Sequence, residues 1–543
     1  MTGTQENVTG AEDPGPAPKV GGIRRVLSEP MWVLGFVILM DEVDKNIIRG
    51  LIYPLQREFG VGDFGIGLLI SLALLFNGLI TVPAGYLADR WNRTRSIGQT
   101  VVGWSGLTAA GALAVNFPML VGLRSALGFG QAVTEPSAAS LIGDHYPVEE
   151  RGRAFSIQQV MLLVGTGVGV LLGGVLGETV GWRWALVVVA LPGLFVAGLV
   201  FRMREPKRGT ADRLGLGADA VAAIEHAQED DHVSLFENGL WAFTKDMVSG
   251  LRADMRTIMA IRTMRYSLVG VAGLLFTVTA IATWLPQYYI RHMGVAPGAG
   301  EAWFGALAIV GGVPGVLLGG RVADRYATRI TGGRLALPAI FLFAGTLLFT
   351  GSYALRTTDT EVVRAPAVCA SVAEATNTGI DADPEDEMEC RDHEVERGDE
   401  VAYVAIDRPV FTPGIFFPAY VMQLVGLFVV CMAIPGLRAG LTDALPAHLR
   451  GAGFGAFNLI AVVFGQAAAP FIVSWLSASF DNNLRTAFLL VSPLSFIGAA
   501  VLFRARKFLD EDMNKIMMAV LTAMQEERDR LTKPSDPSPG APD

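Results

Sequence analysis

The sequence predicts an all-α membrane protein with twelve transmembrane helices arranged as two six-helix bundles. Of the 543 residues, 51% are hydrophobic and only 17% are charged, which is typical of a membrane protein rather than a soluble domain. Twelve apolar segments are long enough to cross a bilayer. In addition, one short motif with charged residues occurs twice, 235 residues apart, as Gly85 to Trp91 and as Gly320 to Tyr326.

The repeated motif divides the chain into two similar halves. A second pair of matching segments, which begin at Pro147 and at Pro446, recurs 299 residues apart. The two offsets differ because a polar insertion, residues 355–410, lies between the two matching segments of the second half. Internal duplication of this kind is typical of secondary transporters, whose binding site lies between the repeats.

The first bundle is expected over residues 31–204 and the second over residues 265–505. Both are delimited by charged turns that separate the apolar segments. The predicted spans, in chain order, are 32–54, 65–87, 97–115, 118–141, 154–177, 183–202, 267–290, 302–322, 334–354, 412–436, 452–478 and 485–504.

The arginines predict the orientation. If residue 1 is cytoplasmic, the short inner turns hold eleven arginines and the short outer turns hold four, which places both termini in the cytoplasm. Residues 1–30 are rich in Gly, Pro and Glu without a continuous apolar core, so we expect a disordered cytoplasmic N-terminus and no cleaved signal peptide. Thirty-six of the 43 basic residues are arginine, a composition that favours a bacterial source and therefore the cell membrane.

Two polar segments lie on the predicted cytoplasmic side. Residues 205–264 join the halves and contain helical stretches such as Leu235 to Arg265, so we expect a linker with amphipathic helices that lies along the membrane. Residues 506–543 begin with apolar side chains at helical spacing beside charged ones, which predicts an amphipathic helix on the inner membrane surface, followed by a tail. Binding of this helix to a partner protein is the alternative.

The insertion at residues 355–410 is strongly acidic and is expected on the outer side. It holds fifteen Asp and Glu against five Arg, a net charge of −10 in a chain whose total is −9. It also holds Cys369 and Cys390, in a compartment that would be oxidising. Two hypotheses stay open here: a cap closed by a Cys369–Cys390 disulfide, and a solvated loop without a fixed fold.

The turn from Gly85 to Arg95 resembles the signature of the major facilitator superfamily. The likeness continues through Arg124 and the glycines of the fourth and fifth spans. Within that superfamily the chain is similar to the Spinster family. The residues that carry this second resemblance are Asp44-Lys45, Phe59-Gly60-Val61, Gly67-Leu68-Leu69, Gly85 to Arg93, Gly128 to Ala132, Glu135-Pro136-Ser137 and Ile142-Gly143-Asp144.

This resemblance implies the major facilitator fold, with two bundles that rock about a central cavity. It also implies a substrate class, namely amphiphilic lipids such as lysophospholipids or sphingoid phosphates. Proton coupling through Asp44 and Glu135 is implied as well, with the proton gradient as energy source and without a cofactor or metal. We expect a monomer in the lipid bilayer.

The first span carries five charged residues, too many for a simple anchor. Asp41, Lys45 and Arg49 follow one another at four-residue steps with Asp44 beside them, so they share one stripe of a helix, whereas Glu42 points elsewhere. Charged side chains inside a bilayer are costly, so this stripe is expected to face the central cavity. The alternative is that this end of the span projects into water.

In the fourth span, Arg124 and Glu135 are eleven residues apart, which is three helical turns and one shared face. Arg124 can grip a carboxylate or phosphate with two parallel hydrogen bonds, whereas Glu135 can change its charge. We therefore expect Arg124 and Lys45 to bind the substrate, and Asp44 and Glu135 to carry the proton. A static ion pair for Glu135 and a packing role for Arg124 are the alternatives.

The repeated charged turn has a second predicted role. A carboxylate near a helix N-terminus that pairs with arginine can stabilise one closed state of the two halves. The residues of this predicted latch are Gly85, Asp89, Arg90 and Arg93, with Asp324 and Arg325 in the repeat. The alternative is that these charges only enforce topology.

The predicted function is therefore proton-linked transport of lipid-like anions by alternating access. Export of hydrophobic drugs is the second hypothesis, and competition by anionic headgroups would separate the two. A membrane receptor that has lost transport is a third, but it would need neither the repeated turns nor the intramembrane charges. The chain lacks nucleotide-binding, metal-ligand and nucleophile motifs, which argues against an enzyme. Its negative charge argues against nucleic acid as a partner.

Overall fold

The computed structural model describes most of both predicted bundles. The described residues are 29–88, 92–146, 148–206, 249, 252, 255–327, 329–330, 332–355, 359–364, 405–444 and 458–532. The predicted disordered N-terminus, most of the 205–264 linker, and Cys369 and Cys390 lie outside them, so these predictions stay untested.

The first half is built from seven consecutive helices. Their ends follow local sequence signals: Asn92 and Asn116 each accept a hydrogen bond from a backbone N–H in the first turn of the helix that they precede, the usual role of an N-cap. The helices are α2 (Pro30–Gly50), α3 (Ile52–Phe59), α4 (Asp63–Ala88), α5 (Arg93–Gly111), α6 (Phe117–His145), α7 (Val148–Thr179) and α8 (Trp182–Phe201).

The second half repeats this architecture with two interruptions. Short π-helical turns, η1 and η3, stand within its second and fifth predicted spans. The elements are α12 (Arg262–Met293), α13 (Ala299–Leu307), η1 (Ala308–Gly312), α14 (Val313–Ala327), α15 (Gly333–Ala354), α18 (Pro413–Asp443), η3 (Ala461–Gln466), α20 (Ala468–Ser479) and α21 (Leu484–Thr532).

The predicted all-α membrane bundle is confirmed. In the described part of the chain, nine helical segments are long and apolar enough to cross a membrane. The three remaining predicted spans coincide with α2, α5 and α6, and the count of twelve crossings stays a prediction. One addition was not predicted: β1 (Asp359–Arg364) and β2 (Ala405–Val410) pair antiparallel at the base of the acidic insertion.

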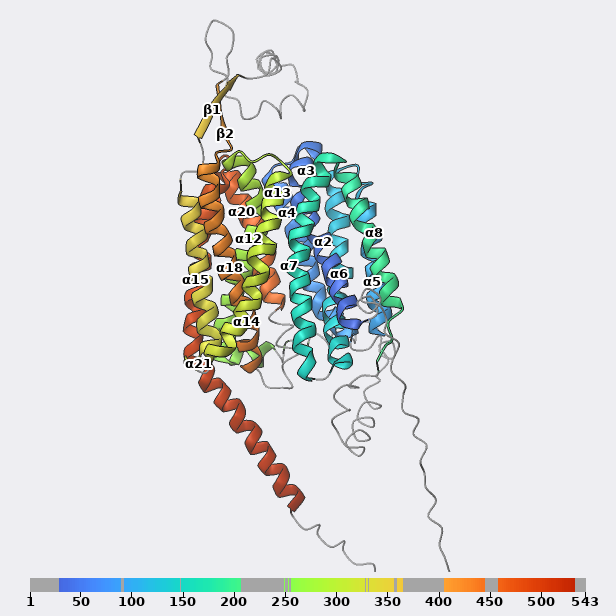
Figure 1. The fold of residues 1–543 in the computed structure, drawn as a ribbon. Coiled ribbons are helices and arrows are strands. Elements are labelled where there is room, and N and C mark those ends of the chain that lie inside the picture. The colour runs from blue at the N-terminus through green and yellow to red at the C-terminus, as the bar shows by residue number, and fades with distance from the viewer. Residues whose placement is uncertain are drawn as a thin grey trace, which may run out of the picture.

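The β1–β2 pair marks one end of the molecule, which we call the hairpin end (Figure 1). The last helix, α21, continues past the other end, which we call the opposite end, and projects away from the bundle. Because successive spans alternate in direction, the turn between α3 and α4 lies at the hairpin end and the turn between α4 and α5 lies at the opposite end.

A face of small residues lets α7 lie close against α2. Gly165, Gly169 and Gly173 lie so near the α2 backbone that a Cβ atom on each would come within 2.7 Å, 2.7 Å and 2.4 Å of a carbonyl oxygen of that helix. Larger side chains at these positions would push the helices apart. This contact positions α2, which carries the buried charged residues Asp41, Asp44 and Arg49.

The two halves are joined at the hairpin end by a cluster around Asp63. Arg291 of α12 binds both carboxylate oxygens of Asp63 on α4 at 2.7 Å. Ser477 of α20 donates a further hydrogen bond to Asp63 at 2.9 Å, and Gln56 contacts both Asp63 and Arg291. The sequence contains no signal for this contact, since Asp63 is 228 residues from Arg291 and 414 residues from Ser477.

Candidate functional site

Three helices that are less apolar than the nine candidate spans, α2, α5 and α6, supply most of the charged and polar side chains of the site. Among the described helices, α2 carries five charged residues in its last ten positions, α6 carries Arg124 and Glu135, and α5 supplies a buried threonine. Polar residues lower the hydropathy of these helices, and each needs a partner inside the bundle. The low hydropathy and the chemistry of the site therefore have the same cause.

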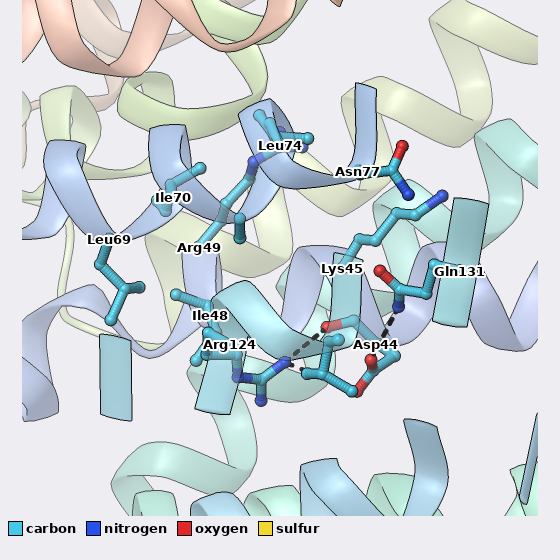
Figure 2. Close-up of a pocket in the computed structure, with 12 residues that line it drawn as sticks. Asp44, Lys45, Ile48, Arg49, Leu69, Ile70, Leu74, Asn77, Arg124 and Gln131 are labelled. Atoms are coloured by element: carbon cyan, nitrogen blue, oxygen red, sulfur yellow. Dashed lines mark hydrogen bonds and ion pairs between the residues drawn. The ribbon is translucent and has the colours of Figure 1, made fainter. Parts of the chain in front are cut away.

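Asp44 is the centre of a buried hydrogen-bond network. Its side chain is buried, with the residue only 4% exposed. Thr108 of α5 donates to one carboxylate oxygen at 2.6 Å, and Gln131 of α6 donates to the other at 3.0 Å. Arg124 forms an ion pair with Asp44 at 3.6 Å. Figure 2 shows the carboxylate reached from both sides by Arg124 and Gln131.

Asp44 pairs with Arg124 but does not use all of its hydrogen-bond donors. Its Nη1 atom also donates to the Asp44 backbone oxygen at 3.2 Å, whereas its Nε and Nη2 atoms are buried without a partner in the described residues. A guanidinium has five N–H donors and no acceptor. Arg124 therefore keeps donors available to a ligand.

Lys45 belongs to a second, adjacent cluster on α2. Its Nζ atom lies 2.5 Å from Asp41 and 3.2 Å from Glu42. The expectation that Glu42 points elsewhere was wrong, because the three-residue step brings Glu42 within reach of Lys45. Thr166 of α7 also donates to Glu42, at 3.3 Å. Four of the five first-span charges thus form two groups, with Asp44 in one and Asp41, Glu42 and Lys45 in the other, whereas Arg49 contacts the neutral Asn46 side chain.

Glu135 takes a different position from the other predicted site residues. It is exposed rather than buried, and it forms no hydrogen bond or ion pair with any residue that the structure describes. Its charge still acts on Lys45 electrostatically. The shared helix face does not bring Glu135 into contact with Arg124.

The site opens into a pocket between α2, α4 and α6 (Figure 2). One part of its wall is charged or polar and the other is aliphatic. The lining residues are Asp44, Lys45, Ile48, Arg49, Leu69, Ile70, Ala73, Leu74, Asn77, Arg124, Leu127 and Gln131. This combination suits an amphiphilic ligand, because a headgroup and a chain can be bound side by side.

The predicted latch is described only in part. Asp89 and Arg90 lie outside the described residues; Gly85 falls in α4 and Asp324 in α14, and Arg325 is exposed. Arg93 is fully buried, and its hydrogen bonds join it to Ser140 and Asp144 of the first half and to Glu205 at the start of the linker, with none to the second half among the described residues. The latch between halves therefore stays a prediction, with a local anchoring role now visible for Arg93.

Glu205 secures the start of α5 in this anchor. It accepts hydrogen bonds at 2.8 Å from the Thr94 backbone N–H and from Arg93 Nε. Burial alone would raise the pKa of the Glu205 carboxyl, but the hydrogen bonds from Thr94 and Arg93 outweigh it and hold this pKa below its ordinary value. The carboxylate is therefore charged at neutral pH.

Several residues of the site escape prediction from sequence. Gln131 lies seven residues after Arg124, two helical turns along the same face, and this spacing could have identified it. Thr108 lies on α5 and Asn77 on α4, and neither stands at a sequence spacing from the other site residues that would have identified it. In the described part of the chain, no three His, Cys, Asp or Glu residues are arranged to hold a metal ion.

Comparisons with known proteins agree with this architecture. Spinster homolog 3 of Danio rerio is 26% identical over 344 residues, which cover 60% of this chain and 63% of that protein. The sphingosine-1-phosphate transporter SPNS2 of Danio rerio is 26% identical over 303 residues, covering 53% and 55%. The match thus spans less than two thirds of these relatives.

Solved structures show the same fold. A bacterial homologue of the human lysosomal transporter Spinster, in an inward-facing and unoccupied conformation, superposes with a TM-score of 0.64 at 19% identity over 90% of this chain and 98% of that one. The D-xylose–proton symporter follows with a TM-score of 0.51 at 14% identity, covering 88% and 96%.

Residues 34–377, more than half of the chain, match the family description Major Facilitator Superfamily. The duplicated halves, the membrane helices and the fold of the solved neighbours point the same way. This chain is a multi-pass membrane protein that belongs to the Major Facilitator Superfamily and is similar to its Spinster members.

Proposed function

We propose that the protein is a proton-coupled secondary transporter that moves amphiphilic, lipid-like anions by alternating access. The observation that carries this proposal is the buried Asp44–Arg124 pair at the edge of a half-aliphatic pocket. A titratable ion pair inside a membrane bundle is costly to keep and marks an ion or substrate pathway. The named relative that transports sphingosine-1-phosphate supports the substrate class.

Protonation of Asp44 would change the charge of the pocket directly. In the charged form the carboxylate binds Arg124, Thr108 and Gln131. When Asp44 takes up a proton, Arg124 loses its anionic partner and can attract an anionic headgroup instead. The proton and the anion would then bind together, which couples the gradient to substrate movement.

Glu135 is proposed as a second proton-coupling residue. It is exposed in this conformation and influences Lys45 through its charge. A carboxylate is solvated in an open pocket but loses that solvation when the pocket closes. Protonation of Glu135 would therefore favour the occluded state.

Lys45 and Arg124 are proposed to attract the headgroup, and the aliphatic wall to hold the chain. Leu69, Ile70 and Leu74 of α4 line the pocket next to these cations. Burial of a hydrocarbon chain there is favourable in proportion to the apolar area removed from water. Export of hydrophobic drugs would use the same wall without the cations.

The hairpin end is proposed as the outer, closed end of the pathway. The Asp63–Arg291 ion pair joins α4 of one half to α12 of the other there, so it must break before the halves can separate at that end. Both termini would then be cytoplasmic, in the cell membrane of a bacterium. The protein is proposed to work as a monomer, without a cofactor or nucleic acid partner.

Transport by the purified protein in liposomes tests the proposal. An imposed pH gradient should accelerate movement of lysophospholipids, and Asp44→Asn and Glu135→Gln should each abolish that acceleration while the protein stays folded. Glu58→Gln is the matched control, because Glu58 is an exposed carboxylate paired with Arg183 outside the pocket.

Three outcomes separate the hypotheses. Variants of Asp44 and Glu135 that keep the wild-type response to the gradient would show that these acids are structural. Uptake of neutral hydrophobic drugs without competition by anionic lipids would favour the drug exporter. Specific lipid binding without any transport would favour the receptor.

A further inference from the structure

Three cations line the pocket, but only two of them have carboxylate partners. Lys45 is neutralised by Asp41 and Glu42, and Arg124 by Asp44. Arg49 forms no ion pair within 4.0 Å with any described carboxylate. Its one described hydrogen-bond partner is the neutral side-chain oxygen of Asn46.

Arg49 is nevertheless buried. It is 8% exposed, and its Nε atom is buried without a hydrogen-bond partner in the described residues. It stands in the last turn of α2, one turn beyond Lys45. The helix C-terminus and the more distant charge of Glu42 attract it. These attractions are weaker than a direct ion pair, so Arg49 is the cation of the pocket that lacks a carboxylate in direct contact among the described residues.

A buried cation without a partner is unfavourable unless a ligand completes it. Arg49 lies beside the aliphatic side chains of α4, with Leu69, Ile70 and Leu74 nearby (Figure 2). The charge and the apolar wall thus occur together, as the headgroup and chain of a single-chain lipid do. Arg49 also cannot lose its charge at physiological pH, unlike the carboxylates around it.

We propose that Arg49 is the residue that selects an anionic headgroup, and that the preferred headgroup is a phosphomonoester. This inference rests on the proposed function and adds the specificity of the same pocket. The planar guanidinium can bind two oxygens of a terminal phosphate. Lys45 and Arg124 also attract the headgroup, but they are already paired with carboxylates and their contribution changes with the protonation of those partners. Arg49 has no such partner among the described residues, so it distinguishes anionic from neutral lipids at any protonation state of these carboxylates.

Two lipids with the same oleoyl chain test the proposal: lysophosphatidic acid, which ends in a phosphomonoester, and monooleoylglycerol, which is neutral. Affinities are measured on the purified full-length protein in detergent. The wild type should prefer the phosphomonoester. Arg49→Gln should reduce that preference by about 10- to 100-fold, the effect of losing a charge-assisted hydrogen bond, and should leave the affinity for the neutral lipid unchanged.

Two further variants make the result specific. Arg49→Lys keeps the charge without the planar fork, so it should retain part of the preference. Arg183→Gln removes an exposed arginine paired with Glu58 outside the pocket, and its preference should equal that of the wild type. Thermal unfolding of each variant is measured in parallel.

The inference is overturned if Arg49→Gln keeps the full preference, or if it loses affinity for both lipids together with thermal stability, since the latter indicates a purely structural role. It is also overturned if Arg124→Gln alone removes the preference, although the proposed transport of lipid anions would then stand. If the wild type binds neither lipid, the proposed substrate class itself fails, and the liposome assay shows this independently.

Discussion

The two halves share one architecture but differ in what they bury. Among the described residues, the first half buries six charged side chains: Asp41, Asp44, Arg49, Asp63, Arg93 and Arg124. The second half buries two, Glu301 and Asp512, and both cap the start of a helix. The interior of the second half relies instead on neutral pairs such as Tyr289 with Gln423.

This difference places most of the buried charged side chains of the described residues in one of the two copies of the fold. Neutral hydrogen bonds hold helices together without responding to pH or to an ion gradient. Buried ion pairs respond to both, at a cost in stability. The first half is therefore the part expected to sense protons, and the second half the part against which it moves.

The largest expected effect concerns the interior of each half. Arg124→Leu leaves Asp44 buried without its cation and should destabilise the protein by about 3 to 5 kcal/mol. Tyr289→Phe removes one neutral hydrogen bond to Gln423 and should cost about 1 kcal/mol. Thermal unfolding in detergent measures both. Equal losses would contradict the contrast between the halves.

The second-largest effect is expected from a change in the ion pair that joins the two halves. Asp63→Asn weakens the bidentate pair with Arg291, and a change of about 1 to 3 kcal/mol is enough to redistribute two conformations. Distances between spin labels placed on α4 and α12 at the hairpin end should lengthen. Unchanged distances, equal to those of the control Glu58→Gln, would mean that other contacts keep this end closed.

A smaller effect is expected at the opposite end, where a hydrogen-bonded contact joins α21 to the start of α12. Asp512 of α21 accepts hydrogen bonds from the backbone N–H and the hydroxyl of Thr263, at 2.9 Å and 2.7 Å, at the start of α12. Asp512→Ala should cost about 1 kcal/mol, as the loss of an N-cap does. Faster amide exchange in the first turn of α12 would locate the loss, and exchange unchanged there would refute the capping role.

The first half has an equivalent fastening with a pH signature. The lowered pKa of Glu205 means that its stabilising charge is present above the ordinary Glu value of 4.5 and is lost as the pH falls through the lower folded value. Because Glu205 is partly exposed, Glu205→Gln should cost no more than about 1 kcal/mol at pH 7. Melting temperatures of the wild type and variant should converge on acidification, and a constant difference would exclude this carboxylate as the cause.

Much of the site was predictable residue by residue, but its pairing was not. The four-residue spacing of Asp41 and Lys45 predicts their contact, which the structure contains. Asp44 and Arg124 are eighty positions apart, and only the packing of α2 against α6 makes them partners. In the acidic insertion, even the secondary structure was missed, because its composition gave no hint of the β1–β2 pair at its base.

The sequence by itself determined the membrane class, the duplicated halves and the helix positions, since hydropathy and internal repeats can be read directly from the order of the residues. Only the tertiary structure decided which buried charges neutralise one another. Ion pairing depends on distances of a few ångströms between helices, and the chain order does not encode them. For this reason the sequence predicted Lys45 and Arg124 as substrate-binding residues and placed Arg49 only in the charged stripe, whereas the structure distinguished Arg49 as the cation without a carboxylate partner among the residues that it describes.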